Sequence, residues 1–236
     1  MHLPILFQDD HYVAIDKPAG LLVHRSPISR DRVFALQTLR DQLGRRVYPV
    51  HRLDRATSGV LVFGLSAEAA RALVGQFEAR QVDKEYLAVA RGWPDASGRI
   101  DHAIADDEGN GVAQAAITRY RRIARVELPV AVDRYPTSRY ALLSVLPETG
   151  RRQQIRKHFK HISHHLIGDT THGNGRQNRF FRNHFDIHRL LLMSRRLTFD
   201  HPYAGDRISV EAGPDDSWRK IERLFEFSVE TAGDSG

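Results

Sequence analysis

The chain has 236 residues, of which 41% are hydrophobic, as is typical of a folded globular protein with one sizeable core in one or two lobes. Lysine and arginine number 35 against 29 aspartate and glutamate, so the net charge is +6 and the pI is about 9.8. The absence of cysteine excludes disulfides and thiolate metal sites, and no apolar stretch approaches the roughly 18 residues of a membrane helix. The N-terminus also lacks a signal pattern, so we expect a cytoplasmic protein.

Hydrophobic spacing along the chain predicts more strands than helices. In chain order it predicts a strand at residues 12–15, a helix at 34–43, a strand at 60–65, a helix at 67–80 after a Ser66 cap, strands at 86–90, 117–123 and 140–146, a helix at 153–162, a strand at 197–199 and a helix at 216–225. Residues 126–139 and 173–188 are predicted to be loops. Helices that are interspersed rather than alternating with strands favour an α+β fold with a mixed sheet over a doubly wound fold.

Basic side chains are concentrated in the second half of the chain. Residues 151–160 hold five lysines and arginines and no acid, and residues 176–196 hold six arginines against the single acid Asp186. Clustered arginine binds phosphate oxygens in pairs, so these segments predict a polyanionic partner, with a merely solvated basic face as the alternative. Residues 226–236 are acidic and rich in small residues, and we expect them to form a flexible tail.

One carboxylate stands out from this basic background. Residues 51–59 read His-Arg-Leu-Asp-Arg-Ala-Thr-Ser-Gly and place Asp54 between Arg52 and Arg55, directly before the apolar run at 60–65. A loop set against a buried strand is where catalytic side chains are commonly placed. Asp54 is therefore a candidate for chemistry, although a similar cluster in an arbitrary protein is more often a solvated ion-pair patch.

Three segments, in order, resemble the motifs of the RluA family of RNA pseudouridine synthases. They are residues 51–59, residues 84–92 (Lys-Glu-Tyr-Leu-Ala-Val-Ala-Arg-Gly) and residues 149–158 (Thr-Gly-Arg-Arg-Gln-Gln-Ile-Arg-Lys-His). Residues 5–24, which contain a Lys-Pro-Ala-Gly turn, resemble the family's opening strand pair, so the similarity runs from about residue 5 to about residue 213. The resemblance implies a pseudouridine synthase fold, which is a mixed, mostly antiparallel sheet with packed helices and a central catalytic cleft. It further implies a single catalytic domain over residues 1–225, without the S4-type RNA-binding domain of many ribosomal members.

The resemblance assigns roles to individual residues. Asp54 matches the catalytic aspartate, Tyr86 the tyrosine that packs against the target uracil, and Arg156 the arginine that pairs with the aspartate. The reaction needs an ionised carboxylate, acting as nucleophile or as general base, and it needs no cofactor or metal. Gln153 departs from the family, which usually has His there, and its amide can donate and accept hydrogen bonds but cannot carry the charge that a role in handling protons requires.

The same resemblance predicts how RNA is held. The target uridine has to be turned out of its helix, and Arg52 is the candidate to fill its place. The remaining candidates for phosphate contacts are Arg55, Arg151, Arg152, Lys157, Arg176 and Arg179. We expect RNA to be the partner, with no membrane and no obligatory protein partner.

Several shorter segments resemble the family members that modify uridine 65 in the acceptor and T-arm stem of transfer RNA. They are residues 23–26, 37–43, 134–140, 168–173 (Gly-Asp-Thr-Thr-His-Gly) and 176–179. Transfer RNA is therefore the expected substrate. Ribosomal RNA, or another position in transfer RNA, remains the alternative.

Two alternatives lie outside this family. His158, His161 and His165 would share one face of a continuous helix, and with His172 they could ligate the metal of a hydrolase. The basic charge alone would also suit a non-catalytic RNA-binding module. Against this module stands the presence of Asp54, because phosphate binding does not require a carboxylate between arginines.

Overall fold

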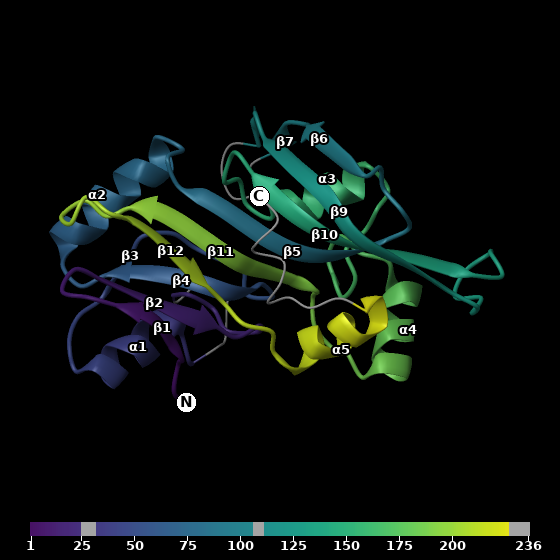
Figure 1. The fold of residues 1–236 in the computed structure, drawn as a ribbon, viewed down its shortest axis with the longest axis horizontal. Helices are drawn as coiled ribbons and strands as arrows, with labels where there is room; N and C mark the ends of the chain where they lie inside the picture. The colour runs from purple at the N-terminus through teal and green to yellow at the C-terminus, as the bar shows by residue number, and fades with distance from the viewer. Residues whose placement is uncertain (25–31, 106–110, 227–236) are drawn as a thin grey trace. The chain divides into compact units, whose positions relative to one another are not determined.

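The computed structural model describes residues 1–24, 32–105 and 111–226. The chain divides into two compact units, Met1–Lys84 with Met193–Ala212, and Glu85–Leu192 with the chain from Gly213 onward (Figure 1). The predicted acidic tail lies outside the described residues from residue 227 onward. The single catalytic domain over residues 1–225 and the central cleft stay predictions.

The strands of the first unit pair in a mixed arrangement. They are β1 (Ile5–Gln8), β2 (Tyr12–Lys17), β3 (Tyr48–Pro49), β4 (Ser58–Gly64), β11 (Leu192–Asp200) and β12 (Arg207–Glu211). Strand β4 pairs antiparallel with β2 and β3, and parallel with β11 where Ser58 and Gly59 face Met193 and Ser194. Strand β1 pairs antiparallel with β2, and β12 pairs antiparallel with β11.

Two helices belong to this unit, α1 (Ala35–Leu43) and α2 (Ala67–Glu78). The predicted Ser66 cap is confirmed, since its hydroxyl accepts from the backbone N–H of Ala69 at 3.0 Å. Helix α2 packs its apolar face on one side of the sheet. The core there consists of Tyr12, Ala14, Val50, Val60, Val62, Ala69, Ala70, Leu73, Val82, Leu197, Phe199, Val210 and Ala212. This packing holds β4, and with it the loop that precedes β4.

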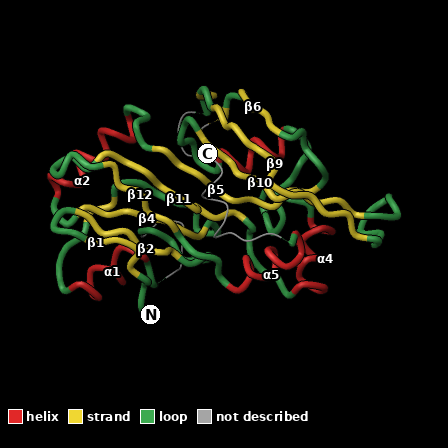
Figure 2. The backbone as a smooth tube through the Cα atoms, in the orientation of Figure 1, coloured by secondary structure: helices red, strands yellow, loops and turns green. Residues whose placement is uncertain are grey.

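The second unit contains an antiparallel sheet in the order β5-β10-β9-β6. Its strands are β5 (Asp83–Arg91), β6 (Ser97–Asp101), β9 (Ile117–Leu128) and β10 (Ser138–Pro147), and a separate pair is formed by β7 (Ile104–Ala105) and β8 (Ala113–Gln114). Strands β9 and β10 continue as a long hairpin beyond the rest of this sheet (Figure 2). Together with the parallel β4–β11 pair, these antiparallel pairs confirm the α+β class with a mixed, mostly antiparallel arrangement.

The helices of the second unit are α3 (Gln154–His161), α4 (Gly175–Phe185) and α5 (Asp216–Phe225). The prediction of a loop over residues 173–188 was wrong, because α4 occupies most of it. The Asn174 side chain caps α4, and Phe181 packs against Tyr140 with ring centroids 4.8 Å apart. The loop predicted at 126–139 is also shorter than expected, since β9 ends at Leu128 and β10 begins at Ser138. Among the described residues, no helix has the length and apolar character needed to cross a membrane.

Candidate active site

The loop that carries Asp54 lies between β3 and β4 in the first unit. Leu53 is buried, which anchors the loop, while Asp54 itself is partly exposed and its carbonyl accepts from the N–H of Thr57 at 3.1 Å. Arg52 and Arg55 are both exposed. The loop thus presents a carboxylate between two basic side chains at the start of a fully buried strand.

The Lys-Pro-Ala-Gly turn holds this loop in place. The N–H of Gly20 donates to the carbonyl of Arg55 at 2.8 Å, and Nε of Arg55 donates back to the carbonyl of Gly20 at 3.0 Å. The buried ammonium of Lys17 donates to the carbonyls of Pro18 and Leu21 at 2.9 Å and of Arg55 at 3.3 Å. A buried ammonium is costly unless its donors are used, so Lys17 stabilises one arrangement of turn and loop.

His51 anchors the other end of the loop as a neutral side chain. Its Nε2 accepts from the backbone N–H of Val62 at 3.1 Å, and its ring stacks on Phe77 with centroids 4.8 Å apart. Burial, reinforced by the charge of Lys84, lowers the pKa of His51 from 6.5 to about 3. Protonation would remove the lone pair that binds Val62, so His51 is suited to a structural role.

This low pKa predicts a pH dependence of stability. The folded state keeps His51 neutral while the unfolded state protonates it below pH 6.5, so its contribution is complete above that pH and is lost as the pH falls towards 3. Between about pH 6 and pH 4, His51 should steepen the loss of unfolding free energy by up to about 1.4 kcal/mol per pH unit. Urea unfolding at several pH values checks this against His51→Gln, whose amide oxygen can accept from Val62 without titrating. Equal slopes for the two proteins would contradict the assignment.

Arg156 lies in the second unit, on a helix that is docked firmly onto β9. The side chains of Gln154 and His158 both bond the hydroxyl of Thr118, at 3.0 and 2.9 Å. Arg156 is only 5% exposed, and its Nε and Nη2 donate to the two carboxylate oxygens of Asp169, each at 2.7 Å. The guanidinium is therefore held along one edge in a buried, paired contact.

Asp169 also belongs to this site, although the sequence did not indicate a role for it. Burial by itself would raise the pKa of Asp169, but hydrogen bonds and charge from Arg156, together with the backbone N–H groups of His172 and Thr171, outweigh burial and lower it. The carboxylate thus stays ionised inside the protein. Its place in the Gly-Asp-Thr-Thr-His-Gly segment was the only signal, and that segment does not show which arginine it meets.

Gln153, where the family usually has His, precedes α3 in a left-handed conformation with φ of 54°. Its Oε1 lies 2.7 Å from Nε2 of His172. An imidazole is therefore present next to this position, but it is supplied by His172. Burial is the main cause that lowers the pKa of His172, so this ring is neutral near pH 7.

Tyr86 lies on β5 in the second unit, where it is partly buried and faces Val145 of β10 in register. Asp54 and its flanking arginines belong to the first unit, whereas Tyr86 and Arg156 belong to the second. The contacts of Asp54 with Arg156 and with a uracil on Tyr86 would join the units, and they stay predictions.

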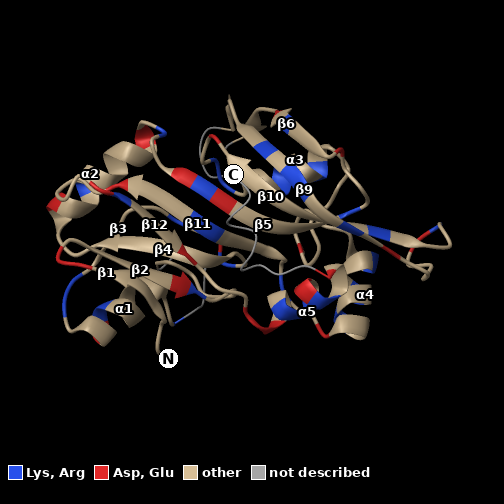
Figure 3. Ribbon diagram, viewed as in Figure 1, with Lys and Arg blue, Asp and Glu red and all other residues tan. Residues whose placement is uncertain are grey.

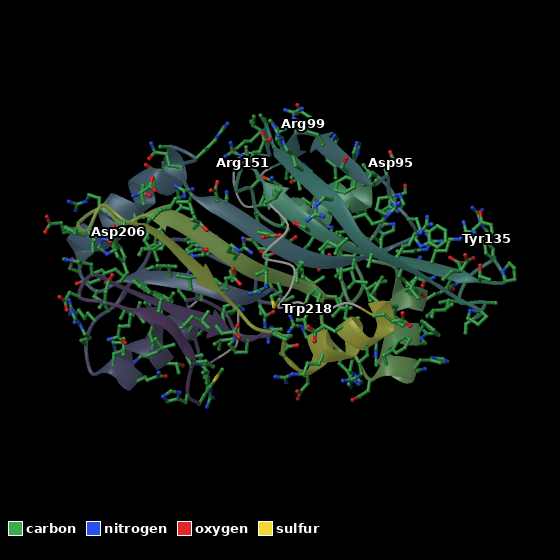
Figure 4. The ribbon with its side chains drawn as sticks, in the orientation of Figure 1. Asp95, Arg99, Tyr135, Arg151, Asp206 and Trp218 are labelled. Atoms are coloured by element: carbon green, nitrogen blue, oxygen red, sulfur yellow. The ribbon has the colours of Figure 1, made fainter. Side chains whose placement is uncertain are left out.

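The remaining candidates for RNA binding also lie in the second unit. Arg152 and Arg179 are exposed, and Arg176 is exposed although it pairs with Asp133 at 2.8 Å. Arg151 (labelled in Figure 4) and Lys157 are partly buried, and each donates to a backbone carbonyl. Further arginines lie along β9, where Figure 3 shows them as a series of blue segments. Their use in RNA binding stays a prediction.

The histidines do not form the metal-ligating face that the metal-hydrolase alternative requires. Helix α3 ends at His161, so His165 lies beyond it and the three histidines do not share one helix face. Both ring nitrogens of His158 are engaged, by Thr118 and by the carbonyl of His102, and Nδ1 of His165 bonds the carbonyl of His172. Within the described part of the chain, no three His, Asp or Glu side chains come together as metal ligands do. The metal-hydrolase alternative thus has no site among these residues.

Similarity to known proteins tests the resemblance of the three motifs. A family model described as RNA pseudouridylate synthase matches residues 11–161, which include Asp54, Tyr86 and Arg156. The tRNA pseudouridine synthase C of Vibrio parahaemolyticus is 44% identical over 240 residues, covering 98% of each chain. The protein of the same name from Pasteurella multocida is 46% identical over 239 residues, covering 97% of this chain and 98% of that relative.

Solved structures agree with the fold. The human protein RNA Pseudouridylate Synthase Domain Containing 4 matches 94% of this chain and 93% of its own with a TM-score of 0.74 at 21% identity. Domain Containing 1 matches 91% of this chain and 84% of its own with a TM-score of 0.70 at 22% identity. The family model and the two relatives confirm the resemblance of the three motifs at the level of the family. The chain belongs to the RNA pseudouridylate synthase family, and it is an RNA pseudouridine synthase, an isomerase.

Proposed function

We propose that this enzyme converts a uridine of transfer RNA into pseudouridine and that Asp54 is its catalytic carboxylate. The observation that carries the substrate is the similarity, at 44% identity over 98% of both chains, to a relative named tRNA pseudouridine synthase C. The loop geometry supports the role of Asp54. Reciprocal bonds between Gly20 and Arg55 hold the backbone of this loop, so the carboxylate starts from a preorganised position.

The isomerisation breaks the N-glycosidic bond, turns the base and rejoins it through carbon, so no group is oxidised or released. Asp54 starts it either by attacking the nucleoside or by removing a proton from the sugar. Tyr86 would form a wall for the uracil, because a stacked ring holds a base while leaving it able to rotate. Arg156 would supply the counter-charge to Asp54. A guanidinium has more N–H donors than the two that Asp169 uses, so Arg156 can bind the carboxylates of both Asp169 and Asp54.

The names of the relatives specify the RNA but not the nucleotide. Uridine 65 remains our prediction for the position, and a different position of transfer RNA is the alternative. In the proposed complex, Arg52 fills the place of the turned-out uridine while the exposed arginines of the second unit contact phosphates. The cytoplasmic location likewise stays a prediction.

A map of pseudouridines in total RNA tests the substrate. Cells lacking the gene should lose one pseudouridine from particular transfer RNAs, wild-type protein should restore it, and Asp54→Asn should not. Loss at a transfer RNA position other than uridine 65 would reject the position but keep transfer RNA as substrate. Loss only from ribosomal RNA would reject transfer RNA while leaving the enzyme class intact.

Replacing Arg156 by Lys should slow isomerisation by roughly 10- to 100-fold while the protein stays folded. A point-like ammonium cannot reproduce the two-pronged contact with Asp169, so the charge would be displaced from its place near the substrate. Single-turnover pseudouridine formation measures the effect. Arg189→Lys is the matched control, since Arg189 pairs with Asp215 elsewhere in the second unit. Full activity of the Arg156 variant would reject the counter-charge role.

A further inference from the structure

Asp169 is built into the second unit more tightly than a simple ion-pair partner requires. Its Oδ1 accepts from the backbone N–H groups of Thr171 and His172, both at 2.9 Å, in addition to Nη2 of Arg156. Its own carbonyl accepts from the side chain of Asn178 on α4 at 2.8 Å. Thr171 and His172 thus bind the carboxylate, and Asn178 binds the backbone of the same residue, through bonds that do not involve Arg156, so the carboxylate can act as a template for the guanidinium.

The turn at residues 169–172 contacts the beginning of α3 at a second point. His172, whose N–H binds Asp169, places Nε2 at 2.7 Å from Oε1 of Gln153, the residue that precedes α3. Arg156 projects from the first turn of that helix and binds Asp169. Gln153, His172, Asp169 and Arg156 thus close a ring of contacts that begins at the residue before α3 and ends in the first turn of that helix. Rotation of the helix or swing of the guanidinium would break at least one of these bonds.

The pair is an unusual choice if stability were its only purpose. The Arg156 and Asp169 side chains are 6% and 1% exposed, and a buried ion pair is often no more stabilising than apolar side chains of the same volume. A paired edge does, however, fix the direction in which the rest of a guanidinium points. This geometry favours orientation over stabilisation.

We infer that Asp169 is a positioning residue that acts on uridine isomerisation through Arg156, an inference that rests on the proposed function. His172 and Gln153 hold Asp169 in place. Asp169 contacts neither substrate nor Asp54 in this scheme. It sets the orientation of the guanidinium that faces them.

The test variant is Asp169→Asn. An amide keeps one oxygen for Thr171, His172 and Nη2 of Arg156, but it places an NH₂ group against the N–H of Arg156 Nε, and two donors cannot bond each other. The guanidinium should turn away, so the single-turnover rate of pseudouridine formation should fall about 10- to 100-fold. The dissociation constant for transfer RNA should stay within about twofold, since the phosphate-binding arginines are unchanged.

Asp215→Asn is the matched control. Asp215 also pairs with an arginine, Arg189, and caps α5 through the N–H of Trp218, a role that Asn fulfils equally well. Figure 4 labels Trp218 on α5. This variant should keep the wild-type rate. Equal losses in both variants would mean that any broken ion pair in this unit damages the enzyme, and the inference would be overturned.

A double-mutant cycle separates positioning from a general structural role. If Asp169 acts only through Arg156, adding Asp169→Asn to Arg156→Lys should lower the rate by less than about twofold more. Effects that multiply would overturn the inference. If Asp169→Asn does not fold, Gln153→Ala, which removes only the contact with His172, takes its place in the cycle with the same expectations and a smaller loss.

Failure of the inference can be told apart from failure of the proposed function. Wild-type protein that forms no pseudouridine in transfer RNA would reject the proposed function. A fully active Asp169→Asn beside an impaired Arg156→Lys would reject only the positioning role.

Discussion

Asp54→Asn is expected to abolish isomerisation, with less than about one thousandth of the wild-type rate remaining, while fold and RNA affinity stay nearly unchanged. An amide of the same shape can neither attack the nucleoside nor take a proton from it. The surrounding loop should keep its structure, because the bonds that hold it use backbone atoms, Lys17 and Arg55. Single-turnover assays on transfer RNA, with RNA binding measured in parallel, provide the check.

The control for this variant is Asp206→Asn, the same replacement at an exposed position of the first unit (Figure 4). It should retain the full rate. Turnover of Asp54→Asn above about one thousandth of wild type would show that another group performs the chemistry and would remove Asp54 from its assigned role.

Gly59→Ala is expected to destabilise the protein by about 3 kcal/mol or more. Gly59 ends the Asp54 loop with φ of +103°, and a Cβ built there would lie 2.1 Å from the carbonyl oxygen of Ser194. That oxygen belongs to β11, which pairs in parallel with β4 at this point, so neither backbone can move without breaking the pairing. Urea unfolding measures the change in unfolding free energy.

Gly75→Ala provides the contrasting result. Gly75 lies inside α2 and a Cβ there would meet nothing within 4 Å, so the substitution should stabilise the protein by roughly 0.5–1 kcal/mol. A Gly59→Ala protein as stable as wild type would mean that the two strands are not packed as closely as described.

The sequence alone determined the elements whose signals are local. Residues 216–225 were predicted as a helix and form α5 with the same bounds, and Ser66 was predicted as a cap and is one. Both signals lie within a few residues of the structure that they specify: spacing of apolar side chains for the helix, and a hydroxyl beside orphan N–H groups for the cap. The motif around Asp54 likewise identified the family, because its residues are contiguous in the chain.

Contacts between distant residues were decided only by the tertiary structure. Helix α4 escaped prediction because its segment is mostly polar, and its burial becomes apparent only once Tyr140 on β10 packs against Phe181. The pairing of Arg156 with Asp169 was equally hidden. Asp169 follows it by thirteen residues, and only the folding of that turn back onto α3 brings the carboxylate to 2.7 Å from the guanidinium. Local spacing encodes neither contact, since each depends on where a separate element docks.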